Sequence, residues 1–418
     1  MKSMRHFRLL ALGYGISAYG SYLDMVALNI FIYSITGNAL TTGLFMAVRL
    51  AATVAAGIIS GRLVSRRDRK LLMVGADITQ AIALIVLLLA GGGARVPLLF
   101  GLAIVLGACS TLTQVALRSS IPEIVGAEQR VRANGILVTV RSLAMVAGFA
   151  SAGVIVARFG YTVAFVLDAA TYLLSALILV LLPIRTRSSS AGGEDADADD
   201  NARWTWLAPL RAAPLLAVMI GVRMGDGLGS SSHNVGLPIY SSALDPSHPA
   251  AFISQFWATW AVGNIIAQQA CGWYTKKTGQ APGERVFVVA SCLMSGAFIV
   301  VFTGLPTLPA VIAALVAGIA DGTSEVSYVS RLQDTPDAQR GRLFGLSASA
   351  ENTSFGLGMV VSAVFFERYS PVQVVAAFHG LAILLCIGFL LLLIMNGAFK
   401  KGPSGRMGVR QRPGSVYD

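Results

Sequence analysis

Charged side chains that interrupt long apolar runs are the residues of this sequence best placed to do chemistry. They are seven acids and three arginines: Asp24, Asp77, Asp168, Asp226, Asp321, Glu325, Glu351, Arg49, Arg141 and Arg223. A charge at the centre of an apolar span costs about 3 kcal/mol on insertion scales and usually faces a polar interior. Such residues typically serve proton transfer or the binding of a charged solute.

Asp24 lies near the middle of the first apolar run, after Gly20, Ser21 and Tyr22. A carboxylate in a low-dielectric interior takes up a proton more readily than one in water, so Asp24 could exchange a proton during a transport cycle. The alternative is a structural acid that pairs permanently with an arginine such as Arg49.

Two other groups have helical spacing. Arg223 and Asp226 are three residues apart, on one helix face, where they can neutralise each other. Asp321 and Glu325 are four apart, and two desolvated acids so close should share one proton. That pair suits a proton relay or a cation site; the alternative is a water-filled vestibule in which both acids ionise.

Arg141 and Glu351 are 210 residues apart, the offset of an internal repeat described below. Equivalent positions in two halves could approach a central cavity from opposite sides and form an exchangeable ion pair, or each could have its own structural partner. Packing or interhelical hydrogen bonding is the simpler expectation for Asp77, Asp168 and His379. Packing is likewise expected for Trp257 and Trp260, which share a helix face.

The elements that must position these residues are twelve membrane-spanning helices, since a span needs about 20 mostly apolar residues. The sequence predicts them at 9–34, 40–64, 71–91, 97–117, 133–157, 162–184, 213–239, 252–274, 286–304, 309–330, 343–366 and 372–396. Only 13% of residues are charged and 55% are hydrophobic, which is far from the composition of a soluble domain. The predicted fold class is an all-α membrane protein.

One connector differs from the short others. Residues 185–211 hold three consecutive serines and five acids, a composition that cannot bury a core, and they are predicted to be a flexible linker. The linker divides the chain into a six-helix bundle over 1–184, a second over 212–398, and a basic tail over 399–418. A short motif recurs at an offset of 210 residues: Gln129-Arg130-Val131-Arg132 with Gly135, then Gln339-Arg340-Gly341-Arg342 with Gly345. Gly148 and Gly358 are related by the same offset, so the halves are predicted to be parallel repeats.

Cations favour one side of these spans. With the N-terminus inside, cytoplasmic segments hold 26 of the 32 Lys and Arg residues, and the opposite side holds only Arg95, Arg158 and Arg368. This bias predicts that both termini are cytoplasmic. It also explains the net charge of +11 by orientation in a lipid bilayer, with no nucleic-acid partner.

The loop after the second span carries a recognisable motif. Gly61-Arg62-Leu63-Val64-Ser65-Arg66-Arg67-Asp68-Arg69-Lys70 is similar to the pattern G-x-x-x-D-R-x-G-R-R of the major facilitator superfamily, with Ser65 in place of the acid and Asp68 in place of the second Gly. The motif is expected to form a tight Gly turn and to place cations against neighbouring helix ends. The resemblance implies the major facilitator fold, with two six-helix pseudo-repeats around a central cavity.

Within that superfamily the chain resembles the third drug–proton antiporter family, which includes macrolide effluxers and the enterobactin exporter. The stretches that carry this likeness are Gly20–Asp24 with Val26-Ala27-Leu28, Asp77, Ala133-Asn134-Gly135, Arg141–Ala144, Ala164–Ala169 and Arg340–Gly345. The antiporter pattern G-P-x-x-G-G of the fifth span appears only as Gly148–Gly153, without its Pro.

The resemblance implies a monomeric secondary transporter of the inner (cytoplasmic) membrane that exports an antibiotic, siderophore or other small amphipathic compound in exchange for protons. The alternatives are a nutrient importer of the same fold and a polytopic lipid flippase. An enzyme is not expected, because the sequence has no HExxH, no metal-spaced His/Cys set and no Ser–His arrangement. A primary ATPase is not expected either, because there is no GxxxxGK[ST] loop. No cofactor or metal is expected.

Overall fold

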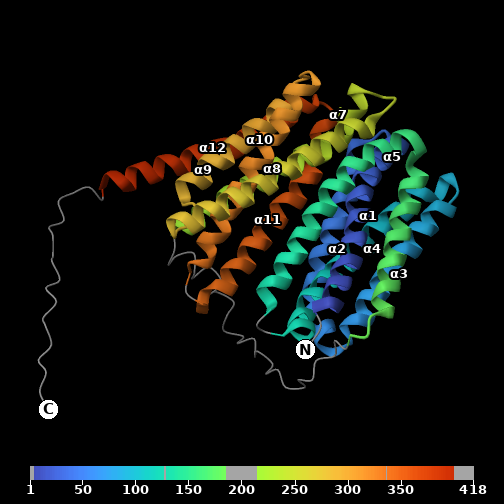
Figure 1. Ribbon diagram of the computed structural model, residues 1–418. Helices are drawn as coiled ribbons and strands as arrows, with labels where there is room; N and C mark the ends of the chain where they lie inside the picture. Colours follow the sequence, from blue (N-terminus) through green and yellow to red (C-terminus); the bar gives the residue numbers. More distant parts are fainter. Residues whose placement is uncertain (1–3, 127–128, 185–213, 336, 400–418) are drawn as a thin grey trace, which may run out of the picture.

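The computed structural model describes residues 4–126, 129–184, 214–335 and 337–399, and its regular elements are helices (Figure 1). The predicted linker, the end of the tail and the termini themselves lie outside the described residues. In chain order the helices are α1 Met4–Thr36, α2 Ala39–Arg66, α3 Arg69–Leu89, the short 3-10 helix η1 Gly92–Ala94, α4 Arg95–Val125, α5 Arg130–Leu181, α7 Pro214–Leu244, α8 Pro249–Thr278, α9 Glu284–Val301, α10 Thr307–Gln333, α11 Asp337–Phe366 and α12 Pro371–Phe399.

The long helix α5 contains two of the predicted spans. Its backbone breaks at Gly160, where φ is 76° and ψ is 175°. A positive φ of this kind is readily adopted only by glycine, so the chain reverses there without a separate loop. With α5 divided at Gly160, the α-helices correspond one to one with the twelve predicted spans.

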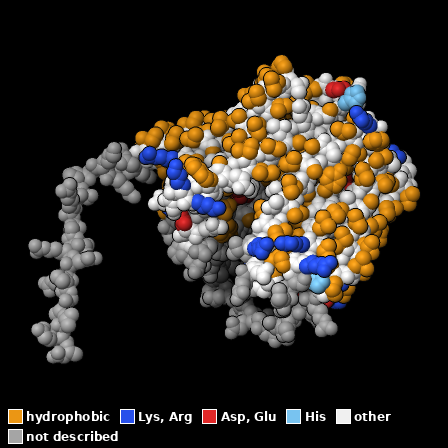
Figure 2. Space-filling view, viewed as in Figure 1, with side chains coloured by type: hydrophobic (Ala, Val, Ile, Leu, Met, Phe, Trp, Pro, Cys, Tyr) orange, Lys and Arg blue, Asp and Glu red, His pale blue; other side chains and the backbone are white. Residues whose placement is uncertain are grey.

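Nine helices in the described part of the chain are long and apolar enough to cross a membrane. They include α5, which counts once although it contains two spans; α7 and α11 are not among them. These two helices carry Arg223, Asp226 and Glu351 together with many serines and glycines. Apolar side chains cover most of the face seen in Figure 2, and charged side chains lie toward its margins.

The helices form two bundles, α1–α5 and α7–α12, which lie beside each other in Figure 1. Inside the first bundle α1 packs against α5 and α2 against α4; inside the second, α7 packs against α11 and α12, and α10 against α8 and α9. Across the boundary, α5 packs against α8 and α2 against α11.

In the part of the chain that the structure describes, the buried core is shared between the two bundles on one side. The largest cluster of buried apolar residues includes Leu28 of α1, Phe149 of α5, Trp257 of α8 and Met359 of α11, all toward the helix ends remote from the N-terminus. On the N-terminal side the cores are separate: one forms around Phe7 and Leu117, the other around Phe287 and Leu332 in a cluster that also holds Tyr328. The bundles are therefore packed together on the far side and separated on the N-terminal side.

Two glycines allow the close approach on the far side. A Cβ at Gly43 of α2 would lie 2.6 Å from Cβ of Ala363 and 2.7 Å from the carbonyl oxygen of Met359, both on α11. A Cβ at Gly153 of α5 would lie 2.9 Å from Ser254 of α8. A larger residue at either position would be too close to the opposite helix unless one of the two moved.

The repeat-related glycines make matching contacts within each bundle. A Cβ at Gly148 would lie 2.7 Å from the Tyr19 carbonyl oxygen of α1, and one at Gly358 would lie 2.2 Å from Ser231 Oγ of α7. In each half, a glycine on the fifth span thus lets that helix pack directly on the first. This correspondence supports the internal repeat predicted from the sequence.

Candidate functional site

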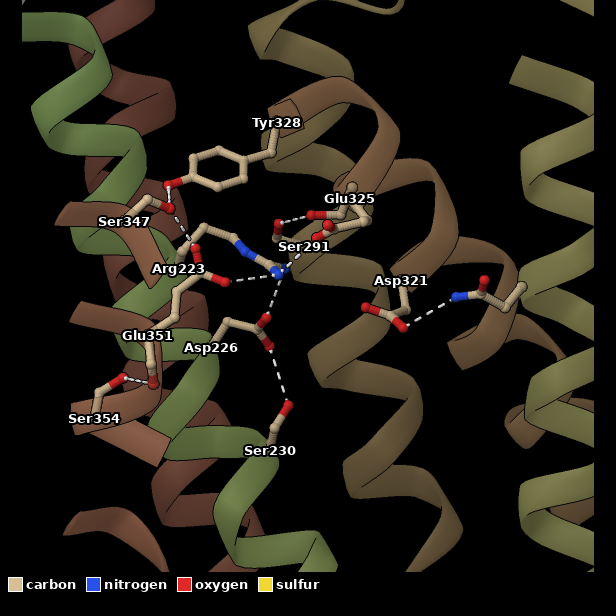
Figure 3. A network of polar contacts seen from close by, with 12 residues as sticks. Arg223, Asp226, Ser230, Ser291, Asp321, Glu325, Tyr328, Ser347, Glu351 and Ser354 are labelled. Atoms are coloured by element: carbon tan, nitrogen blue, oxygen red, sulfur yellow. Dashed lines mark hydrogen bonds and ion pairs between the residues drawn. The ribbon is translucent and has the colours of Figure 1, made fainter. Parts of the chain in front are cut away.

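Arg223 of α7 is the centre of a charged network in the second bundle (Figure 3). Its guanidinium lies 3.0 Å from Asp226, 2.7 Å from Glu325 of α10 and 3.1 Å from Glu351 of α11. The ion pair expected between Arg223 and Asp226 is present. The sequence did not predict that Glu325 and Glu351 would join it, because they lie on two other helices that only the fold brings together.

Hydroxyl groups extend this network. Ser347 donates to Glu351 at 2.6 Å, and its hydroxyl lies 2.5 Å from the hydroxyl of Tyr328. The Tyr328 ring faces the Arg223 guanidinium, with Cζ 5.4 Å from the ring centroid. Each hydroxyl can both donate and accept, so a proton can move along such a chain without displacement of the heavy atoms.

Asp321 lies apart from Glu325. It accepts a hydrogen bond of 3.2 Å from Asn264 of α8, while Glu325 reaches Arg223 (Figure 3). Each acid thus has its own hydrogen-bond or ion-pair partner, while Glu325 still acts electrostatically on Asp321, and the sharing of one proton between them stays a prediction. Their spacing does place them on one face, but their side chains diverge.

The network carries more acids than cations. Arg223 supplies one positive charge, against the four carboxyl groups of Asp226, Glu325, Glu351 and Asp321. Breaking a buried ion pair leaves a charge that costs about 3–5 kcal/mol, so an acid surplus here favours the binding of protons or a cation. Glu325 is the most accessible member of the ion-paired set, with its side chain 50% exposed against 10% for Asp226 and 27% for Glu351.

Metal ligation has no support in the described ranges. No group of three or more His, Cys, Asp or Glu side chains there is placed to hold a metal ion.

The first bundle contains a polar cavity of about 190 Å³. Its lining residues come from α1 to α5: Tyr14, Ser17, Ala18, Ser21, Tyr22, Met25, Arg49, Asp77, Gln80, Ser110, Thr113, Gln114, Arg141 and Tyr172. Two predicted site residues, Arg49 and Arg141, thus line one cavity. Asp77, for which packing was expected, lines it too.

Three acids of the first bundle are almost fully buried. Asp24, Asp77 and Asp168 are at most 1% exposed, and neither oxygen of Asp24 has a hydrogen-bond partner in the described structure. Arg49 lies within electrostatic reach of Asp24 and Asp168. Asp24 is therefore buried beside a cation, as the sequence suggested, but its carboxylate is not held in a hydrogen-bonded pair.

Arg141 does not meet Glu351. Its Nε donates to the Tyr22 hydroxyl at 2.9 Å, whereas Glu351 belongs to the Arg223 network. The expected ion pair is absent from this conformation, because the two residues lie on the N-terminal side of the shared core, where the bundles are separated.

Aromatic rings connect the bundles just beyond Arg141. Tyr22 contacts Phe149 at 5.2 Å between centroids, Phe149 stacks on Trp257 at 5.8 Å, and Trp257 contacts Trp260 at 5.3 Å. Trp257 is 7% exposed, as expected for a packing residue, and Phe149, on which it stacks, belongs to the other bundle.

His379 of α12 makes an interhelical hydrogen bond, as expected, and its partner is His233 of α7, which the sequence did not single out. His233 Nδ1 lies 3.1 Å from His379 Nε2, and the His233 ring stacks on Phe298 at 3.9 Å. His233 and His379 lie 209 and 211 residues after Asp24 and Asp168, each one residue from the repeat offset of 210. A glycine packs against the later member in each case, Gly20 against Asp168 and Gly229 against His379.

The loop motif anchors helix ends, as predicted for its cations. Arg69 donates to the Ser119 carbonyl at 2.7 Å and pairs with Glu123 on α4, and Lys70 donates to the Leu182 carbonyl at 2.8 Å, at the end of α5. Asp68 caps α3 by accepting from the Lys70 amide. Arg66 and Arg67 are exposed.

The expected glycine turn in this motif is wrong. Gly61 lies inside α2, which continues to Arg66, and a Cβ there would meet open space. The chain turns at Arg67 and Asp68, because Asp68 terminates the loop by capping the next helix.

We expect Arg69→Gln to lower the free energy of unfolding by about 1–2 kcal/mol, since a charge-assisted bond and a helix-end carbonyl lose their donor. Thermal unfolding of the purified chain in detergent measures this. Arg66→Gln, in the same loop but exposed, is the control and should change little. Equal melting temperatures for the two variants would show that the Arg69 contacts do not stabilise the fold.

Comparisons with known proteins agree with this architecture. A family model described as Major Facilitator Superfamily matches residues 10–337. No curated protein matches the chain. Among solved structures, the nucleoside transporter NupG is 14% identical with a TM-score of 0.72, covering 93% of this chain and 99% of its own. A bacterial homolog of the human lysosomal transporter Spinster, in an inward-facing conformation, is 15% identical with a TM-score of 0.67, covering 94% of this chain and 95% of its own. A peptide transporter POT in complex with sulfate is 16% identical with a TM-score of 0.68, covering 95% of this chain and 96% of its own.

Proposed function

Because the chain belongs to the major facilitator superfamily, whose members move small molecules across membranes, we propose that it is a secondary active transporter that exports a small hydrophobic or amphipathic compound in exchange for protons. The observation that carries the proposal is the Arg223 network, where several acids share one buried cation. An acid that leaves such a network takes up a proton, and an acid that returns releases it, so protonation can be tied to movement.

Alternating access follows from the position of the shared core. We infer that the N-terminal side faces the cytoplasm, because described cations such as Arg66, Arg130 and Lys276 lie on that side. The conformation is then open to the cytoplasm and closed to the outside. Export begins when a compound enters between the bundles from this side, and it requires the Gly43 and Gly153 contacts to open.

Import by the same fold is the second candidate, since the same two conformations can carry a compound either way. Lipid flipping is the third. The likeness of the sequence to drug–proton antiporters favours export, and the polar lining of the first-bundle cavity favours a compound with a polar end over a purely apolar one.

The experiment is uptake of fluorescent amphiphiles by proteoliposomes under an imposed pH gradient, with one cationic, one neutral and one anionic dye. We expect uptake of at least one dye to collapse when a protonophore is added. Glu325→Gln should reduce gradient-driven uptake about tenfold or more, because glutamine keeps the shape but cannot exchange a proton.

Asp334→Asn is the matched control, since this acid lies at the end of the same helix and its side chain is 68% exposed. It should transport as the parent does. Dye movement that ignores the protonophore would contradict proton exchange. Transbilayer movement of a fluorescent phospholipid, with no dye movement, would favour the flippase.

A further inference from the structure

Arg141 differs from the other two arginines that lie within spans. Arg223 contacts three carboxylates, and Arg49 lies within electrostatic reach of two buried acids. Arg141 donates to the neutral hydroxyl of Tyr22, and the groups that act on it electrostatically are tyrosines. Among the span arginines that the structure describes, it alone has no acid among the groups that contact it or act on it electrostatically.

The cavity around Arg141 can hydrogen-bond an anion. The hydroxyls of Tyr14, Ser17 and Tyr22 and the amide of Gln114 line it together with the guanidinium. Tyr14 also lies within electrostatic reach of a second cation, Arg118. Asp77 lines the same cavity, but both its carboxylate oxygens are buried, so the accessible charge is positive.

The size of the cavity limits what it can hold. Drug-sized ligands occupy about 300–1,000 Å³, and this cavity has about 190 Å³. It suits a head group, with the rest of the molecule outside it. The half-buried ring of Tyr22 adjoins Arg141 and lines the cavity, so it offers an apolar surface to that remainder.

We propose that Arg141 binds the anionic head group of the transported compound, and that the compound is an amphipathic organic oxyanion. This rests on the proposed function and adds the chemical class of the cargo. A guanidinium suits a carboxylate or phosphate because its fixed donors match two oxygens at once.

The test is equilibrium binding to the purified chain in phosphatidylcholine nanodiscs, where no anionic lipid competes. The probes are dansylaminoundecanoic acid and its methyl ester, which share the apolar body and differ in head-group charge. The parent should bind the acid about tenfold or more tightly than the ester, since a charge-assisted bond is among the stronger ones. Arg141→Gln should abolish this preference, and Arg141→Lys should retain part of it.

Arg158→Gln, an exposed arginine farther along α5 and outside the cavity, should retain the full preference. Equal binding of acid and ester by the parent overturns the anion site, as does an unchanged preference in Arg141→Gln. These binding measurements need no pH gradient, so they test the anion site independently of the proposed function. If transport is insensitive to the protonophore but the parent still prefers the acid, proton exchange is rejected and the anion site is retained.

Discussion

Arg223→Gln is expected to abolish transport and to lower the free energy of unfolding by about 3–5 kcal/mol, because it leaves Asp226, Glu325 and Glu351 without their shared cation. Thermal unfolding and gradient-driven uptake measure the two effects. Arg331→Gln is the control: this arginine on α10 pairs with Glu284 but is 44% exposed, so its loss should cost about 1 kcal/mol or less.

Adding Glu351→Gln to Arg223→Gln should recover part of the lost stability, because one fewer acid is then unpaired. Coupled sites give a double-substitution energy that differs from the sum of the single ones, whereas independent sites add. Strict additivity would show that Glu351 does not depend on Arg223. Transport should stay low in the double variant, since the exchange of partners is lost even where stability returns.

Gly43→Leu combined with Gly153→Leu should hold the bundles apart on the far side and stop transport. Each new Cβ would lie within 3 Å of the opposite bundle, too close to accept without movement. Overpacking costs about 1–3 kcal/mol per site. The combined cost at the two sites therefore approaches roughly 5.5 kcal/mol. That free energy is enough to reverse the equilibrium between the closed and the open far side from about 99:1 to 1:99.

Spin labels at Gly91 and Leu305, in far-side loops of the two bundles, would measure this as a longer distance in the double variant. Gly101→Leu on α4 is the control, since a side chain there meets open space. A variant that misfolds would lose its cooperative thermal transition, which separates misfolding from opening. Unchanged distances with a normal transition would show that these glycines do not govern closure.

The fold was accessible from the sequence because span length and apolarity are local properties. The twelve predicted spans correspond to the helices, and even the reversal at Gly160 fell between the predicted fifth and sixth spans. Helix ends were less accurate: α4 continues to Val125 and α10 to Gln333, since helices extend beyond the apolar region into polar residues that hydropathy does not count.

The residues of the candidate site could be singled out from the sequence, but only one of their pairings could. Spacing along one helix found the contact of Arg223 with Asp226, because side chains three apart share a face. Contacts between helices depend on rotation and on conformation, and these decided that Glu351 meets Arg223 and that Arg141 meets Tyr22. Helical spacing places Glu325 and Asp321 on one face of α10, but their side chains bind different neighbours: Glu325 contacts Arg223, and Asp321 contacts Asn264.

The polar character of α7 and α11 has a consequence for how the chain is made. A helix that carries Arg223 and Asp226 among serines and glycines does not partition readily into lipid by itself when it leaves the ribosome. The more apolar helices that follow, α8 and α12, are among the nine described helices that are long and apolar enough to cross a membrane. We therefore expect α7 to enter the bilayer together with α8, and α11 together with α12, during synthesis of the second bundle.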